Sequence, residues 1–182
     1  MTTTGGRGDL AAELCGITKR FGDLVANDAV DLALTRGEVH ALLGENGAGK
    51  TTLMRILYGL THADAGTIAV DGSPVAIHSP RDAIGAVIGM VTQHFSLVQH
   101  MFVTENVILG RASGAHLDLA AARGSVERAA ERFGIAVEPD AIVADLSVGE
   151  QQRVEIVKAL ARDCRVLILD EPTAVLVPQE VD

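Results

Sequence analysis

The chain has 182 residues, of which 48% are hydrophobic, and 24 acidic against 15 basic side chains give a formal net charge of −9. This length can bury a sizeable core, whereas the acidic balance argues against broad binding of nucleic acid or anionic membranes, which needs clustered lysine and arginine. No apolar run approaches the roughly eighteen residues of a membrane span, and the first residues lack the apolar segment of a signal peptide. With only two cysteines, we expect a cytosolic chain with free thiols.

The first part of the chain is typical of a β region. Residues 1–9 are expected to form a disordered lead-in. The segments 10–17 and 25–34 are strand-like and are separated by the polar turn 18–23. The short apolar run 39–43 then predicts a buried strand.

That run leads into a glycine-rich loop that fits the pattern G-x-x-x-x-G-K-[ST]. The glycines let successive N–H groups point at phosphate oxygens, Lys50 supplies charge for the β- and γ-phosphates, and the Thr51 hydroxyl can ligate Mg²⁺. Apolar residues at helical spacing follow, so a helix should open here and favour an anion at its N-terminus. A chance glycine-rich turn is the alternative. The predicted nucleotide ligands are Gly44, Glu45, Asn46, Gly47, Ala48, Gly49, Lys50, Thr51 and Thr52.

The next segments alternate strand and helix signals. Residues 67–70 and 74–77 predict a hairpin, and Ser79 with Pro80 should open a short helix. Residues 89–92 predict a strand that ends at Gln93. From about 103 to 145 the pattern is helical, with Leu119, Ala122, Val126, Ala129 and Phe133 at a helix period.

Residues 166–169 form a continuous apolar run that is closed by two carboxylates, as in the Walker B pattern. Such a run predicts a strand buried on both faces of a parallel sheet, with its carboxyl end where ligands bind. Asp170 would then hold Mg²⁺, and Glu171 would polarise the water that attacks the γ-phosphate. A strand that merely ends in solvated acids is the alternative.

Residues 146–153 read Leu-Ser-Val-Gly-Glu-Gln-Gln-Arg, and Ser147 with Glu150 forms the pattern of a capping box. A capped helix with Val154, Val157 and Ala161 on one face explains these two residues. It does not explain Gly149, which costs helix stability. A glycine beside a serine at a helix N-terminus suits a backbone contact with phosphate.

These motifs together resemble the nucleotide-binding domain of an ATP-binding cassette (ABC) transporter. Residues 146–151 are similar to that family's signature, usually LSGGQ, with Val148 and Glu150 as replacements. This variant, with residues 173–176 and 178–180, resembles ATPase subunits of bacterial importers of simple sugars and nucleosides, in which two such domains are usually fused. The resemblance covers residues 10–182.

The resemblance implies an α/β fold: a P-loop NTPase core with a parallel sheet, an N-terminal antiparallel β subdomain and an inserted helical subdomain at about 94–152. It implies that Phe21 stacks on adenine, unless this ring only anchors a hairpin. Gln93 would sense Mg²⁺ and the γ-phosphate. Residues 94–102 would line the groove for the permease's coupling helix, or else pack against the helical subdomain.

By the same resemblance, the chain is expected to be the ATP-hydrolysing, energy-coupling subunit of an importer. Two domains would enclose two ATP molecules with Mg²⁺, each bound by one domain's phosphate loop and by Ser147, Gly149 and Glu150 of the other. The implied partners are transmembrane permease subunits, a second nucleotide-binding domain and, indirectly, a substrate-binding protein, but no nucleic acid. The implied location is the cytoplasmic face of the bacterial inner membrane.

Two departures from the family pattern leave alternatives open. Val177 follows Leu176 where an aspartate is usual, and no histidine follows Glu171 to serve as the family's switch histidine. We therefore expect the N-terminal part of a longer ATPase or a truncated product. A nucleotide-binding module without hydrolysis and a soluble ABC ATPase of translation or DNA repair remain the competing hypotheses.

Overall fold

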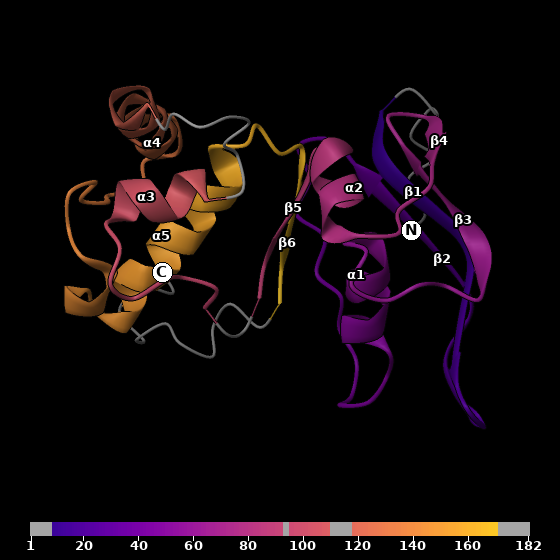
Figure 1. Ribbon diagram of the computed structural model, residues 1–182. Helices are drawn as coiled ribbons and strands as arrows, with labels where there is room; N and C mark the ends of the chain where they lie inside the picture. The colour runs from indigo at the N-terminus through magenta and orange to yellow at the C-terminus, as the bar shows by residue number, and fades with distance from the viewer. Residues whose placement is uncertain (1–8, 93–94, 110–117, 171–182) are drawn as a thin grey trace. The chain divides into compact units, whose positions relative to one another are not determined.

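The computed structural model describes residues 9–92, 95–109 and 118–170, and the chain divides into two compact units, Met1–Ile88 and Gly89–Asp182 (Figure 1). Each unit is described by itself. Several sequence predictions lie outside the described residues, namely those on the lead-in 1–8, Gln93, Glu171 and residues 173–180. Asp9, the last residue of the predicted disordered lead-in, is described, and its carbonyl accepts a hydrogen bond of 2.9 Å from the Arg36 N–H.

The first unit is built on an antiparallel sheet of four strands in the order β2-β1-β3-β4. The strands are β1 (Leu10–Phe21), β2 (Leu24–Thr35), β3 (Ala65–Val70) and β4 (Ser73–Val75). The first two are longer than predicted, and the predicted turn 18–23 is wrong except for its last two residues. The ladder continues through polar Lys19 and Arg20 because the Asp64 carboxylate accepts hydrogen bonds from the Lys19 ammonium and the Arg20 N–H.

The predicted hairpin between β3 and β4 is confirmed, with the two-residue turn Asp71-Gly72. Both turn residues have positive φ, 52° at Asp71 and 75° at Gly72. This is the backbone that a two-residue hairpin turn requires, because its twist then matches that of the strands, and Asp-Gly is a preferred pair for it.

Two helices complete the first unit, α1 (Lys50–Leu57) and α2 (Pro80–Gly85). The predicted start of α2 is confirmed, since the Ser79 hydroxyl accepts a hydrogen bond of 3.3 Å from the Asp82 N–H. Of the four apolar residues that follow the loop at helical spacing, Leu53, Ile56 and Leu57 are buried on α1. The fourth, Leu60, lies beyond the helix end and is half-exposed. The sheet and both helices supply the buried apolar side chains, among them Leu14, Ile17, Leu53, Ile56, Leu57, Val70 and Ala83.

The predicted buried strand at residues 39–43 is wrong. The segment has no regular secondary structure, and Val39 and Leu43 are 100% and 90% exposed. A strand needs a neighbour that pairs with its N–H and C=O groups, and within the described residues no ladder includes this segment. An apolar run is therefore insufficient to fix a strand, because its hydrogen-bonding partners come from elsewhere in the chain.

The second unit combines a two-stranded parallel sheet with a group of helices (Figure 1). Its elements are β5 (Ile88–Val91), α3 (Val103–Ile108), α4 (Leu119–Phe133), the 3₁₀ turn η1 (Val143–Asp145), α5 (Val148–Leu160) and β6 (Val166–Leu169). The helices share an apolar core of Leu97, Val103, Val107, Val126, Ala129, Val143, Val154, Val157 and Ala161. Within the described part of the chain, no helix has the length and apolar character of a membrane span.

The prediction that residues 166–169 are buried on both faces of a sheet is wrong, although their assignment to a strand is confirmed. Val166 and Ile168 are buried, but Leu169 is 43% exposed. Among the described strands, β6 pairs only with β5. Asp170 follows directly, and its N–H donates a hydrogen bond of 3.0 Å to the Val91 carbonyl, so the acidic residue is fixed at the strand end.

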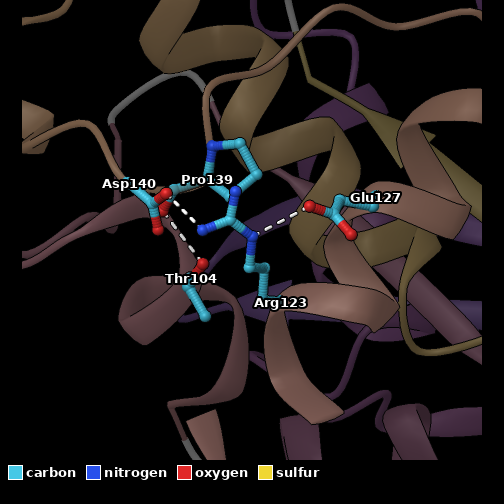
Figure 2. A network of polar contacts seen from close by, with 5 residues as sticks. All are labelled: Thr104, Arg123, Glu127, Pro139 and Asp140. Carbon is cyan, nitrogen blue, oxygen red and sulfur yellow. Dashed lines mark hydrogen bonds and ion pairs between the residues drawn. The ribbon is translucent and has the colours of Figure 1, made fainter. Parts of the chain in front are cut away.

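Polar contacts join α3 and α4 to the segment that precedes η1 (Figure 2). The Arg123 guanidinium lies between the carboxylates of Glu127, at 2.9 Å, and Asp140. The Thr104 hydroxyl donates a hydrogen bond of 2.9 Å to the Pro139 carbonyl. These contacts fix the connection between α4 and η1 against both helices.

Candidate nucleotide-binding site

The predicted phosphate loop ends at Gly49, which is the N-cap of α1 and has φ of 83°. A Cβ at this position would lie 2.1 Å from the Ala26 carbonyl oxygen and 2.9 Å from Nδ2 of Asn27. Both the left-handed backbone and the close approach of β2 therefore exclude any side chain. Gly49 is required here because the loop passes directly against the backbone of a strand.

Lys50 folds back over the loop that precedes it. Its Nζ donates hydrogen bonds of 2.7 Å to the Gly44 carbonyl and 2.9 Å to the Glu45 carbonyl. A further hydrogen bond of 3.1 Å, from the Ala48 N–H to the Glu45 carbonyl, tightens the loop. Neutral carbonyl acceptors thus hold the ammonium group against the loop, and its positive charge suits a bound phosphate.

The first turn of α1 is suited to an anion. Gly49 provides no side-chain cap, and no acidic residue stands in the first turn. Helix N-termini present N–H groups and the positive end of the helix dipole. The half-buried hydroxyl residues Thr51 and Thr52 stand in the same turn. The loop, the ammonium group and the helix start therefore fit a phosphate group.

Phe21, the predicted adenine-stacking residue, is the last residue of β1 and is 51% exposed. The Lys19 ammonium lies 5.4 Å from the centre of its ring. Because the Phe21 ring is exposed, its face is accessible to a base, on which it can stack without any change in the core.

In the second unit, the predicted capping box at the start of α5 is confirmed. The Glu150 carboxylate accepts hydrogen bonds from the Ser147 N–H at 2.8 Å and from the Ser147 hydroxyl at 2.7 Å. These two hydrogen bonds hold the pKa of Glu150 below its ordinary value, and the one from the hydroxyl has the larger effect. Gly149 lies in the first turn of the same helix.

A second polar cluster joins α5 to the segment that follows Gln93. Glu155 is buried, and its carboxylate accepts hydrogen bonds from the Ser96 N–H at 2.5 Å and from the Ser96 hydroxyl at 2.9 Å. The Lys158 ammonium lies 3.4 Å from the Ser96 carbonyl, and desolvation lowers its pKa. Ser96 therefore ties segment 95–97 to α5.

The next residues of this segment are held from α3. The Asn106 side chain is fully buried, accepts a hydrogen bond of 2.7 Å from the Val98 N–H and donates to the carbonyls of Val98 and Phe102 at 3.0 and 3.2 Å. The side chains of the two residues whose backbone Asn106 holds, Val98 and Phe102, are themselves 42% and 46% exposed. Phe102 forms an isolated β-bridge with half-exposed Ile142. We call Val98, Phe102 and Ile142 the apolar patch.

The predicted site residues are thus divided between the units. The first unit contains Phe21 and residues 44–52, which are the loop and the first turn of α1, whereas Ser147, Gly149, Glu150 and Asp170 belong to the second. Gln93 and Glu171 lie outside the described residues, so the predicted Mg²⁺ ligands Thr51, Gln93 and Asp170 stay a prediction. The structure adds Asn27, a buried residue of β2 that contacts the loop. Its only signal in the sequence is a polar amide with low strand propensity inside a strand.

Comparison with known proteins connects these features. A family profile described as ABC transporter matches residues 27–174. The nucleoside import ATP-binding protein NupA of Lactococcus lactis is 54% identical over 171 residues, 93% of this chain. The guanosine import ATP-binding protein NupO of Bacillus subtilis is 48% identical, and the ribose import ATP-binding protein RbsA 1 of Burkholderia thailandensis is 52% identical. The chain spans about a third of the length of these relatives, 34–35%.

Solved structures agree on the fold. The structure of cbiO1 from Clostridium perfringens, part of the ABC transporter complex cbiONQ, is 32% identical and superposes with a TM-score of 0.77 over 94% of this chain and 69% of its own. An ATP-binding cassette of an ABC transporter in its ADP conformation gives a TM-score of 0.81 at 23% identity, over 94% of this chain and 72% of its own. The fold is therefore that of an α/β P-loop NTPase, and the chain belongs to the ABC transporter family.

Proposed function

We propose that this chain is the ATP-binding and ATP-hydrolysing part of an importer for nucleosides or simple sugars. The observation that carries the proposal is the loop at Gly49 and Lys50, where a left-handed glycine packed against a strand meets an ammonium group folded over the loop. Relatives named for nucleoside and ribose import, at about half identity over nearly the whole chain, support import as the process.

Each loop residue has a role that follows from its chemistry. The backbone N–H groups and the Lys50 ammonium would stabilise the charge of the β- and γ-phosphates. Thr51, Gln93 and Asp170 supply oxygen donors, which suit Mg²⁺, and the bound cation would neutralise phosphate charge. Glu171 would accept a proton from the attacking water. Phe21 would stack on the adenine.

The second unit supplies the other half of the proposed site. Ser147, Gly149 and Glu150 stand at the N-terminus of α5 and would contact the nucleotide held by the loop of a second domain. Binding of two nucleotides would therefore bring two domains together, and hydrolysis would release them.

The proposed partners are transmembrane permease subunits, with a substrate-binding protein acting through them, at the cytoplasmic face of the bacterial inner membrane. The apolar patch of Val98, Phe102 and Ile142 supports a contact with such a subunit, since it is exposed while the backbone below it is fixed by Asn106. The names of the relatives support both substrate classes, nucleosides in NupA and NupO and a sugar in RbsA 1.

The first test is binding of Mg·ATP to the 182-residue chain by calorimetry. Gly49→Ala should weaken binding at least about tenfold, because the new Cβ would collide with the Ala26 carbonyl and displace the loop. The matched control is Gly72→Ala, which has a similar positive φ of 75° but open space around the new Cβ. Equal affinity of Gly49→Ala and Gly72→Ala for Mg·ATP would show that the loop does not bind the nucleotide.

The second test is phosphate release by the same chain. We expect turnover in the wild type and, in Glu171→Gln, binding of Mg·ATP without turnover. Binding with no phosphate release at high protein concentration would instead identify a nucleotide-binding module without hydrolysis. Full turnover in Glu171→Gln would remove this residue from the mechanism.

A further inference from the structure

A buried amide contacts the phosphate loop from outside the motif. Asn27 of β2 is 5% exposed, and its Nδ2 donates a hydrogen bond of 3.3 Å to the Gly49 carbonyl. The orientation of the amide follows from this contact, since exchanging its two atoms would bring two acceptors together. The carbonyl that it holds belongs to the last residue of the loop.

A β-bulge directs this side chain. In the ladder between β1 and β2, Ile17 pairs with Val30 and Lys19 pairs with Asn27, so β2 contains an extra residue between the pairs. Within the bulge, Ala29 has φ of 47°, an unfavourable backbone for a residue other than glycine, and its N–H is held by the Thr18 hydroxyl at 3.0 Å. Bulges often occur where a side chain must be turned to a new direction.

The packing of Asn27 is not optimal for stability alone. Its Oδ1 is buried and, within the described residues, has no hydrogen-bond partner. An unpaired buried acceptor is costly. The Gly49 carbonyl does not depend on the amide for a hydrogen bond, since it already accepts one of 2.9 Å from the Leu53 N–H. An apolar side chain of similar size would therefore serve folding better than asparagine does.

The peptide that joins Gly49 to Lys50 explains what the amide does. A trans peptide is planar, with its C=O and N–H pointing in opposite directions. Asn27 holds the Gly49 carbonyl so that it points along the helix. The Lys50 N–H therefore points the other way, toward the loop, as an N–H at an anion-binding helix N-terminus does. We propose that Asn27 is a positioning residue for nucleotide binding, which orients the Lys50 N–H toward the phosphates; this inference rests on the function proposed above.

The test compares stability with affinity in Asn27→Leu. We expect an unchanged or higher Tm, because the variant removes an unpaired acceptor and leaves no group without a partner. The dissociation constant of Mg·ATP should nevertheless rise about tenfold, the loss expected for one hydrogen bond to a charged group. The Lys50 amide resonance should also shift in the free protein. A merely structural role predicts the opposite combination, a lower Tm with the Lys50 resonance in place.

Two further variants make the outcome decisive. Ile17→Val removes one methylene from the core of the same sheet, so it should lower Tm with unchanged affinity. Asn27→Ser is polar but too short to reach Gly49, and should weaken binding as Asn27→Leu does even if the leucine variant fails to fold. Wild-type affinity in Asn27→Leu or Asn27→Ser overturns the inference. Absence of Mg·ATP binding by the wild-type chain overturns the proposed function and this inference with it.

Discussion

Gly49 and Asn27, the two residues that hold the end of the phosphate loop, differ in what fixes them in place. Gly49 is fixed by a spacing pattern whose chemistry is local, so its place in a phosphate loop could be predicted. Asn27 is defined by its burial and by a bulge in a ladder between distant residues. Neither property has a local sequence signal, so its contact with the loop emerged only from the fold.

Glu150 allows a prediction about pH at the same scale. Its carboxylate caps α5, and hydrogen bonds from Ser147 lower its pKa. A lowered carboxyl pKa stabilises the folded state above the ordinary glutamate value of about 4.3, and this stabilisation disappears as the pH falls through the lowered pKa. We expect wild type to be more stable than Glu150→Gln at neutral pH, and the difference to vanish in acid.

Thermal unfolding of the two proteins between pH 7 and pH 3 checks this expectation. The control is Glu131→Gln, which changes an exposed carboxylate of α4 away from any helix start. A stability difference between wild type and Glu150→Gln that is the same at every pH would contradict the assigned role of the carboxylate.

At the scale of elements, local signals predicted caps and turns well. The Ser79 cap, the Asp71-Gly72 turn and the start of α5 are all confirmed, since each depends on residues within about four positions. The strand predicted at 39–43 is wrong because pairing depends on distant partners. For the same reason the bounds of β1 and β2 were underestimated, since the ladder continues through polar residues. The helical subdomain at 94–152 stays a prediction.

The contact of Asn106 with the segment 98–102 gives a prediction at the same scale. Asn106→Leu would leave the Val98 N–H without its acceptor. The carbonyls of Val98 and Phe102 would lose the amide donor but keep the N–H groups of Met101 and Asn106. One buried group left unpaired costs about 1–3 kcal/mol, so we expect a loss of about 2 kcal/mol in the free energy of unfolding. Urea denaturation measures it.

The control for this prediction lies in the same segment. Gln99→Ala removes an exposed side chain whose amide is 3.4 Å from Gln151, and should change the free energy of unfolding by less than about 0.5 kcal/mol. Equal stability of Asn106→Leu and Gln99→Ala would show that the Asn106 amide does not hold the segment 98–102 in place.

At the scale of the whole molecule, the chain contains two compact units with separate internal cores. The first core gathers around Leu14 and Ile17 of the sheet, and the second around Val126 of α4. Stability need not be uniform across such a molecule, because compact units can open separately. The length of the chain alone did not indicate this division, since 182 residues are enough for one core.

This division predicts how a core defect is distributed. Val126→Ala removes buried methyl groups and should destabilise the second unit by about 2 kcal/mol, whereas the exposed Val148→Ala in the same unit should not. Native-state hydrogen exchange then distinguishes the units: protection of the Val126 and Val157 amides should fall, and that of the Leu14 and Ile17 amides should persist. Equal losses at all four amides would mean that the two cores unfold together. In that case a change at the Asn106 segment would reach the phosphate loop through global stability, and variants of the second unit could be compared for nucleotide affinity only at matched stability.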